Sequence, residues 1–189
     1  GMPLGIILVV TDTDGIHPIP LLQKILGLVI NLMRSVPFLI LLFIVLPLSK
    51  IIIGTRIGSP AIIIPLTIAA APYIARVVES SFREIDAGVI EAAKSMGAST
   101  WQIIWKVLLP ESKPSLLLGA ALAITTILSY SAMAGFTGGG GLGAIAINYG
   151  YYRYEPELMW IAVILLVVMV QIIQEIGTRL SKKSDKRIR

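Results

Sequence analysis

Residues 84–110 read EIDAGVIEAAKSMGASTWQIIWKVLLP and form the only long polar-containing segment between two strongly apolar stretches of the chain. The first half of the segment predicts a short helix over residues 87–96. Asp86 precedes this helix, and its carboxylate can accept a hydrogen bond from the unpaired amides of the first turn. Gly97 follows the helix at the position where a left-handed residue commonly ends one. Val89, Ala93 and Met96 fall on one predicted apolar face, which Ile90 extends.

The second half predicts another short helix that begins at Ser99. Ser99 and Gln102 have capping-box spacing, so each side chain can satisfy the other residue's backbone donor. Pro110 is expected to stop the helix, because a residue that precedes proline, here Leu109, is pushed away from helical dihedral angles. The apolar face of this helix consists of Ile103, Ile104, Val107 and Leu108.

The spacing of these residues resembles a known motif. Glu91-Ala92-Ala93 is followed by three residues and Gly97, then by nine residues and Val107-Leu108-Leu109-Pro110. This arrangement is similar to the EAA loop of ABC-importer permease subunits, E-A-A-x3-G-x9-I-x-L-P, with Val107 in place of isoleucine. In that family the loop docks in a groove of a cytoplasmic ATPase subunit. The resemblance therefore implies ATPase-coupling roles for Glu91, Ala92, Ala93, Gly97, Leu109 and Pro110. The alternative is an ordinary amphipathic connector that packs on its own protein.

Composition indicates the fold class. Hydrophobic residues make up 56% of the 189 residues and charged residues only 14%, whereas soluble domains average about 25% charged residues. We therefore expect an all-α, polytopic membrane protein. Cysteine is absent, and His17 is the single histidine, so we predict no catalytic residue, no metal site and no cofactor. An intramembrane hydrolase would need a nucleophile beside a base, and His17 has no paired serine motif.

The net charge of +5 could suggest a nucleic-acid partner. However, six of the sixteen basic residues lie between Arg179 and Arg189, next to an apolar stretch. That placement is typical of a membrane-orientation signal rather than of a nucleic-acid patch. The positive-inside rule then places the loop at about 83–113 and the C-terminus in the cytoplasm, and the loop at 135–156 outside.

Hydropathy divides the chain into membrane spans and connections. We interpret residues 1–10 as the remnant of a first transmembrane helix, and residues 11–189 as the permease domain. Residues 11–20 are predicted to be a loop, and residues 21–34 an amphipathic helix. The glycine-rich residues 135–150 are expected to form an irregular turn, and residues 179–189 a frayed tail. The predicted spans are residues 36–48, 61–78, 114–134 and 158–176.

Further motifs narrow the resemblance. Arg34-Ser35-Val36-Pro37-Phe38 is similar to the R-S-x-P-F opening of amino-acid importer permeases. The order of these parts resembles the permeases of methionine ABC importers along essentially the whole chain. The most specific feature is Tyr130-Ser131-Ala132-Met133, followed by Gly140-Gly141-Leu142-Gly143. The resemblance implies about five transmembrane helices, the first largely missing here, in a homodimer embedded in the lipid of a bacterial inner membrane.

The resemblance also implies a mechanism. The permease would move D- or L-methionine into the cytoplasm by alternating access, while a separate ATPase subunit hydrolyses ATP. A periplasmic or lipid-anchored binding protein would deliver the substrate. Tyr130, Ser131 and Met133 are candidates for the translocation path or gate, although Met133 can equally be a core residue and Ser131 can bond back to its own helix. Alternatives are a permease for another amino acid or a small osmolyte, and a non-transporting membrane scaffold.

Overall fold

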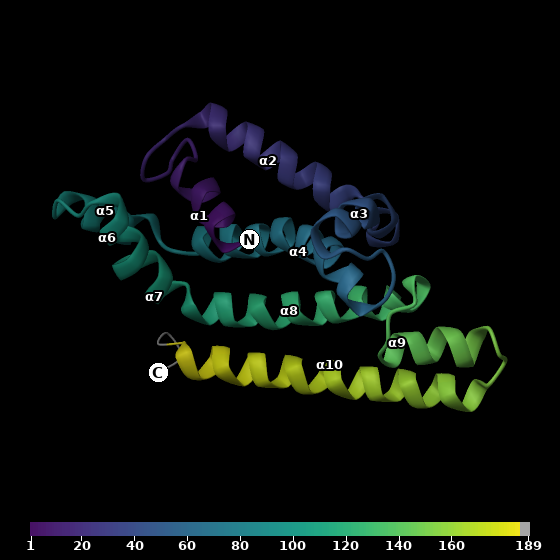
Figure 1. Cartoon of the computed structure of the whole chain (residues 1–189). Coiled ribbons are helices and arrows are strands. Elements are labelled where there is room, and N and C mark those ends of the chain that lie inside the picture. The colour runs from purple at the N-terminus through teal and green to yellow at the C-terminus, as the bar shows by residue number, and fades with distance from the viewer. Residues whose placement is uncertain (186–189) are drawn as a thin grey trace. The chain divides into compact units, whose positions relative to one another are not determined.

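The computed structural model describes residues 1–185, and its regular elements are all helical (Figure 1). In chain order these are α1 (Met2–Val10), α2 (Pro20–Ser35), α3 (Phe38–Ile53), α4 (Ser59–Arg83), α5 (Ala87–Ser95), α6 (Thr100–Ile103), a π-helical segment (Ile104–Leu108), α7 (Leu109–Glu111), α8 (Lys113–Ala132), a 3-10 segment (Met133–Thr137), α9 (Leu142–Ile145), a second π-helical segment (Ala146–Tyr151) and α10 (Pro156–Ser184).

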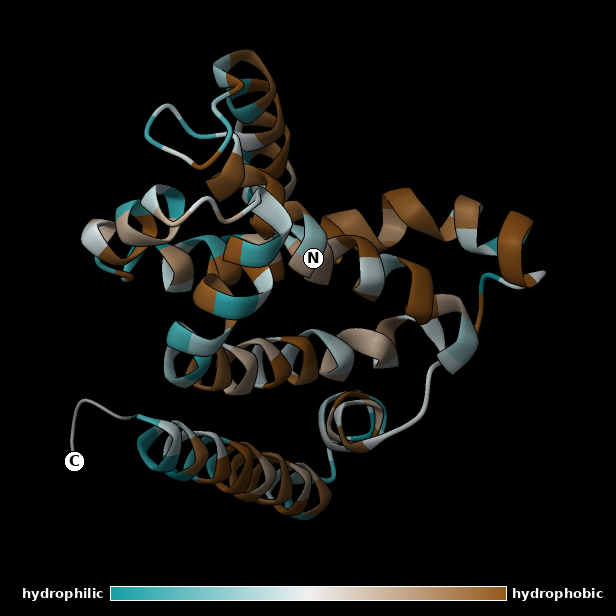
Figure 2. Cartoon of the chain, turned by 90° about the vertical axis from the view of Figure 1, so that its left-hand side faces the viewer, coloured by the Kyte–Doolittle hydropathy of each residue, from teal (hydrophilic) through white to brown (hydrophobic). Residues whose placement is uncertain are grey.

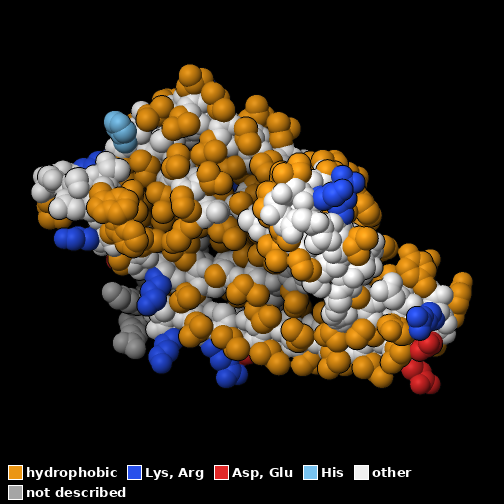
Figure 3. Space-filling view, in the orientation of Figure 1, with side chains coloured by type: hydrophobic (Ala, Val, Ile, Leu, Met, Phe, Trp, Pro, Cys, Tyr) orange, Lys and Arg blue, Asp and Glu red, His pale blue; other side chains and the backbone are white. Residues whose placement is uncertain are grey.

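Three of the described helices are long and apolar enough to cross a membrane. They are α4, α8 with its 3-10 extension to Thr137, and α10. The bent pair α2 and α3 would make a fourth crossing if it counts as one span. Figure 2 shows apolar residues along these helices, and Figure 3 shows hydrophobic side chains along α10 with basic side chains at its C-terminal end. The predicted all-α fold with several membrane spans is therefore confirmed.

The chain forms two compact units. The first unit comprises Gly1–Ser35, Ala71–Ala123 and Ile176–Arg189. Its main core joins the C-terminal end of α4 to the segment between α4 and α8. Residues of α1 and of the loop after it also pack against this core. The buried members of the core are Val78, Phe82, Ile85, Ala93, Ile103, Ile104 and Leu108.

The second unit comprises Val36–Ala70 and Ile124–Glu175. Its core is formed by α3, α4 and the end of α8, and contains Phe38, Leu42, Ile62 and Ala134. Glycine permits a close approach next to this core. A Cβ atom at Gly143 would lie 2.1 Å from the carbonyl oxygen of Ala132, so no side chain fits there.

The glycine-rich stretch is more ordered than predicted. Residues 142–151 are helical, first as α9 and then as a π-helical segment, so the predicted irregular turn over 135–150 is wrong for this part. The true turn is confined to residues 138–141, where Gly138 and Gly141 adopt positive φ angles of 71° and 100°. The two glycines supply the left-handed conformations of this short turn, and the residues after it form a helix.

The C-terminal segment also differs from its prediction. We expected a frayed tail from Arg179, but α10 continues to Ser184. A contact within the first unit holds this end of the helix: the Ser181 hydroxyl donates a 2.7 Å hydrogen bond to the carbonyl oxygen of Pro114. The part of the prediction that concerns residues 186–189 lies outside the described residues.

Candidate functional site

The segment between α4 and α8 folds as the predicted pair of short helices. Asp86 caps α5, because its Oδ1 accepts a 2.7 Å hydrogen bond from the Gly88 amide. Gly97 adopts a φ of 76° in the left-handed region, and the next amide, of Ala98, donates to the Ala93 carbonyl oxygen over 3.1 Å. This closure turns the chain sharply into α6. We call residues 84–111 the coupling hairpin.

The predicted capping box at the start of α6 is confirmed. The Ser99 amide donates to Gln102 Oε1 over 2.9 Å, and the Gln102 amide donates to Ser99 Oγ over 3.4 Å. These two bonds satisfy amides that would otherwise have no helical partner. They fix the direction in which the second helix of the hairpin leaves the turn at Gly97.

We expect Ser99→Ala to remove this cap and to destabilise the protein by about 1 kcal/mol. Thermal unfolding of the detergent-purified protein measures the effect. Ser95→Ala is the matched control, because Ser95 is exposed at the end of α5 and has no described hydrogen bond from its side chain. Equal stability of the two variants would contradict a stabilising role for the capping box.

Pro110 does not end the second helix, which corrects the prediction. Leu109 has helical φ and ψ angles of −64° and −45°, and Pro110 lies in the first turn of α7. The reason is the π-helical segment Ile104–Leu108 directly before it. A π turn is wider than an α turn and lacks the usual i→i−4 bonds, so a proline ring and its missing donor cost less there.

Burial identifies which side of the hairpin faces its own unit. Ala93 is only 3% exposed, and Ile90 packs against the same core. The predicted apolar face of α5 is therefore only partly correct, since Val89 and Met96 are exposed, Met96 by 80%. The apolar face predicted for the second helix is confirmed: Ile103, Ile104 and Leu108 are buried, and Val107 packs beside them.

The hairpin also exposes a pair of apolar aromatic side chains. Trp101 and Trp105 are 67% and 53% exposed, and their rings meet edge to face with centroids 5.4 Å apart. The sequence analysis did not single out these tryptophans, although their i,i+4 spacing in an amphipathic helix would have been a signal. We call the exposed residues Glu91, Ala92, Met96, Gly97, Trp101 and Trp105 the hairpin surface.

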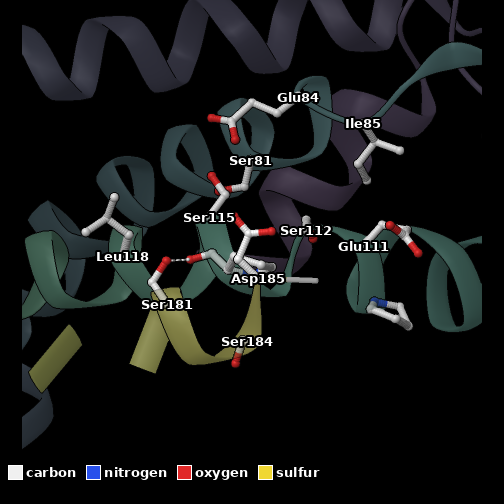
Figure 4. A pocket seen from close by; sticks show the side chains of 12 residues that line it. Ser81, Glu84, Ile85, Glu111, Ser112, Ser115, Leu118, Ser181, Ser184 and Asp185 are labelled. Carbon is white, nitrogen blue, oxygen red and sulfur yellow. Dashed lines mark hydrogen bonds between the residues drawn. The ribbon is translucent and has the colours of Figure 1, made fainter. Parts of the chain in front are cut away.

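The structure separates the six residues that were predicted to couple to an ATPase. Glu91, Ala92 and Gly97 belong to the hairpin surface, whereas Ala93 is buried beneath it. Leu109 packs against the core of the first unit. Pro110 lines a cavity of about 280 Å³ whose wall also carries the carboxylates of Glu84 and Glu111 (Figure 4).

A charge cluster around one buried carboxylate lies at the base of the hairpin. Glu79 is 5% exposed and forms ion pairs with Arg76 and, over 3.0 Å, with Arg83. Arg76 Nη2 also donates to Asn31 Oδ1 of α2 over 2.7 Å. The i,i+3 and i,i+4 spacings of Arg76, Glu79 and Arg83 were visible in the sequence, but the partner on α2 was not.

The path candidates lie in the second unit, in two different settings. Tyr130 stacks on Phe38 with ring centroids 4.6 Å apart and planes 6° from parallel, and Met133 packs against the same core. The Ser131 hydroxyl donates a 2.7 Å hydrogen bond to the Leu128 carbonyl oxygen, so the expected hydrogen bond from Ser131 to its own helix is present. Of the three, only Ser131 lines a mostly apolar cavity of about 270 Å³, which Met169 also lines.

Known proteins resemble this chain over most of its length. The family described as "Binding-protein-dependent transport system inner membrane component" matches residues 1–189. The "Probable D-methionine transport system permease protein MetI" of Vibrio cholerae is 50% identical over 187 residues, which are 99% of this chain and 83% of that protein. The "Methionine import system permease protein MetP" of Bacillus subtilis is 42% identical over 165 residues, which are 87% of this chain and 74% of that one.

A solved structure is also similar throughout the chain. It is described as "Inward facing conformations of the MetNI methionine ABC transporter" and superposes with a TM-score of 0.96 at 43% sequence identity. The match covers 98% of this chain and 86% of the other. The chain therefore belongs to the family of inner membrane components of binding-protein-dependent transport systems.

Proposed function

We propose that the chain is the permease subunit of an ABC importer that moves methionine, as the D or L form, into the cytoplasm. Support for the substrate comes from the names of the relatives and from the structure at TM-score 0.96. Another amino acid or a small osmolyte is the alternative substrate. Uptake of labelled methionine by the reconstituted complex, in competition with other amino acids, tests this choice. A competitor that blocks uptake more strongly than unlabelled methionine would contradict it.

The observation that carries the mechanism is the coupling hairpin. Its inner side is buried in the first unit, while Glu91 and the two tryptophans remain exposed. Exposed apolar patches of this kind mark protein–protein contacts, and aromatic residues are frequent among the energetically dominant contacts. We assign the hairpin surface to the docking of a cytoplasmic ATPase subunit. ATP hydrolysis then resides in that partner, and this chain supplies transport only.

The construction of the hairpin suits transmission of force. Both helices are capped, the turn at Gly97 is closed by backbone bonds, and the buried side shares a core with the end of α4. An ATPase that moves the hairpin surface would therefore move α4 with it. In this proposal two copies of the permease enclose the path, the C-terminus and the hairpin face the cytoplasm, and a binding protein delivers substrate on the opposite side.

We assign the translocation path to the second unit, near Tyr130, Ser131 and Met133. An apolar cavity with few polar groups suits a small ligand with an apolar side chain, and Ser131 and Met169 line such a cavity. Thioether sulfur atoms contact aromatic and apolar groups favourably. Tyr130 would act as part of a gate, held in one orientation by its stacking on Phe38.

Two substitutions test the docking assignment. Glu91→Ala removes the only carboxylate of the hairpin surface, and Gly97→Leu places a side chain where φ is 76°. A left-handed residue with a side chain costs about 1–2 kcal/mol, so the turn should open. We expect methionine uptake per ATP hydrolysed by the reconstituted complex to fall about tenfold, which corresponds to 1.4 kcal/mol.

The control for Glu91→Ala is Glu84→Ala, which removes an exposed carboxylate outside the hairpin surface. It should retain the wild-type ratio of uptake to hydrolysis. An unchanged ratio in both Glu91→Ala and Gly97→Leu, with normal amounts of protein in the membrane, would overturn the docking assignment.

A further inference from the structure

We propose that the loop of residues 11–19 is a clamp that positions the coupling hairpin and joins it to α1 and α2. This inference rests on the proposed function, because it concerns how motion of the hairpin reaches the rest of the first unit. The contacts that support this inference run from the loop to two helices. These are α4, which leads into the hairpin, and α5, which is the first helix of the hairpin. We call Asp12, Gly15 and Ile16 the N-terminal clamp.

The first contact holds α5 directly. Lys94 Nζ donates a 3.1 Å hydrogen bond to the carbonyl oxygen of Gly15, a residue 79 positions earlier in the chain. Lys94 follows Glu91 on the same helix by three residues, so the bond is formed within one turn of the hairpin surface. Glycine at position 15 lets the loop fold back tightly on the end of α1. A Cβ atom there would lie 2.6 Å from the carbonyl oxygens of both Val9 and Val10.

The second contact holds the entrance to the hairpin. Arg83 is the last residue of α4, and its Nη2 forms a 2.7 Å ion pair with Asp12 Oδ2. The same guanidinium binds Glu79, which in turn binds Arg76. Arg76 donates to the Gly27 carbonyl oxygen, 3.1 Å away on α2. A continuous chain of ion pairs and one hydrogen bond therefore links the clamp, the end of α4 and α2.

The third contact is apolar. Ile16 packs against the core that contains Ala93 and Ile103, and Val9 and Val10 of α1 pack against it too. The loop is itself held in shape, because the His17 amide donates to the Val10 carbonyl oxygen over 2.9 Å and the Ile19 amide to that of Thr11 over 3.0 Å. An ordered loop with three kinds of contact can transmit a displacement of the hairpin to α1 and α2, whereas a flexible loop could not.

Movement of the hairpin then has two routes into the first unit. One runs through the core shared with α4, and the other through the N-terminal clamp to α1 and α2. Arg83 has a half-exposed side chain, 52% accessible, and exposed ion pairs contribute little to stability. Loss of the clamp should therefore change where the hairpin lies more than whether the protein folds. Asp12 and Lys94 act as positioning residues through the hairpin and do not touch substrate.

The test is a double substitution, Asp12→Asn with Lys94→Met, which removes the negative charge from the contact with Arg83 and the donor from the contact with Gly15. The matched control is Asp14→Asn with Lys106→Met, because these residues are exposed and have no described ion pair or hydrogen bond from their side chains. The chain has no cysteine, so His17→Cys and Ser95→Cys can carry two spin labels, one on the loop and one on α5. Double electron–electron resonance then measures the distance between loop and hairpin in the folded, monodisperse protein.

We expect a narrow distance distribution in the wild type and in the control, and a broadened one in the double variant. In the reconstituted complex the double variant should retain ATP hydrolysis and lose severalfold in uptake per ATP. A distribution as narrow as in the wild type would overturn the clamp. Broadening with unchanged uptake per ATP, while Glu91→Ala does reduce it, would overturn the clamp's role in coupling. If both Glu91→Ala and Gly97→Leu also have no effect, the docking assignment fails, and the broadening still supports the clamp as a positioning device.

Discussion

Gly143→Ala is expected to destabilise the second unit by about 3 kcal/mol or more, at the upper end of overpacking effects. The added methyl group would lie 2.1 Å from the Ala132 carbonyl oxygen and 2.4 Å from the Ala132 Cα. Both atoms belong to the backbone, which cannot rotate away as a flexible side chain can. The end of α8 and α9 would have to separate. For a chain of this size the melting temperature should fall by about 6–12 °C.

Gly140→Ala is the matched control within the same glycine run. A Cβ atom at Gly140 would meet only Ser59 Oγ at 3.9 Å, an ordinary van der Waals contact. Its φ is not positive, so alanine is tolerated there. A melting temperature of Gly143→Ala equal to that of Gly140→Ala would show that α9 does not pack against the end of α8 as described.

Glu79→Gln is expected to produce the second large effect, a loss of about 3 kcal/mol in the free energy of unfolding. The substitution keeps the size of the side chain but removes the negative charge between Arg76 and Arg83. Breaking a buried ion pair on one side is costly because the remaining charge is left without compensation. Arg83 is half exposed and can turn to solvent, so most of the cost falls on Arg76, whose side chain is 24% accessible.

Chemical denaturation measures how the loss of stability is divided between the two residues. The variants are Glu79→Gln, Arg83→Gln and the double variant. Residues within one ion-pair network are coupled, so the double variant should lose less than the sum of the single losses. Glu84→Gln is the control, because Glu84 is exposed and forms no ion pair among the described residues. Strictly additive losses, or a loss for Glu79→Gln no larger than for Glu84→Gln, would contradict the network.

Much of the fold could be predicted because membrane spans and helix caps are local signals. Hydropathy located three spans: the predicted residues 61–78, 114–134 and 158–176 lie within Ser59–Arg83, Lys113–Thr137 and Pro156–Ser184. The helix caps were predicted correctly, since a cap depends on neighbours within four residues. They are formed by Asp86, by Ser99 with Gln102, and by Gly97. The position of the hairpin between spans also followed directly from the sequence.

The failures have a common physical origin in contacts with distant residues. Pro110 signals a helix end locally, but the π-helical segment before it creates the room that the ring needs. Val89 and Met96 have helical spacing with Ala93, yet only Ala93 reaches the core. The partners of Lys94 and Arg83 on the loop lie about 70 to 80 positions away, and periodicity within a helix does not reveal such partners.

The π-helical segment Ile104–Leu108 sets the rotational phase of the coupling hairpin. An α-helix turns by about 100° for each residue, and the wide turn accommodates one residue more than an α turn would. Without that residue, Trp101 would rotate around the helix axis by about this angle relative to Leu109 and the start of α8. The extra residue thus decides which direction the tryptophans face relative to α8.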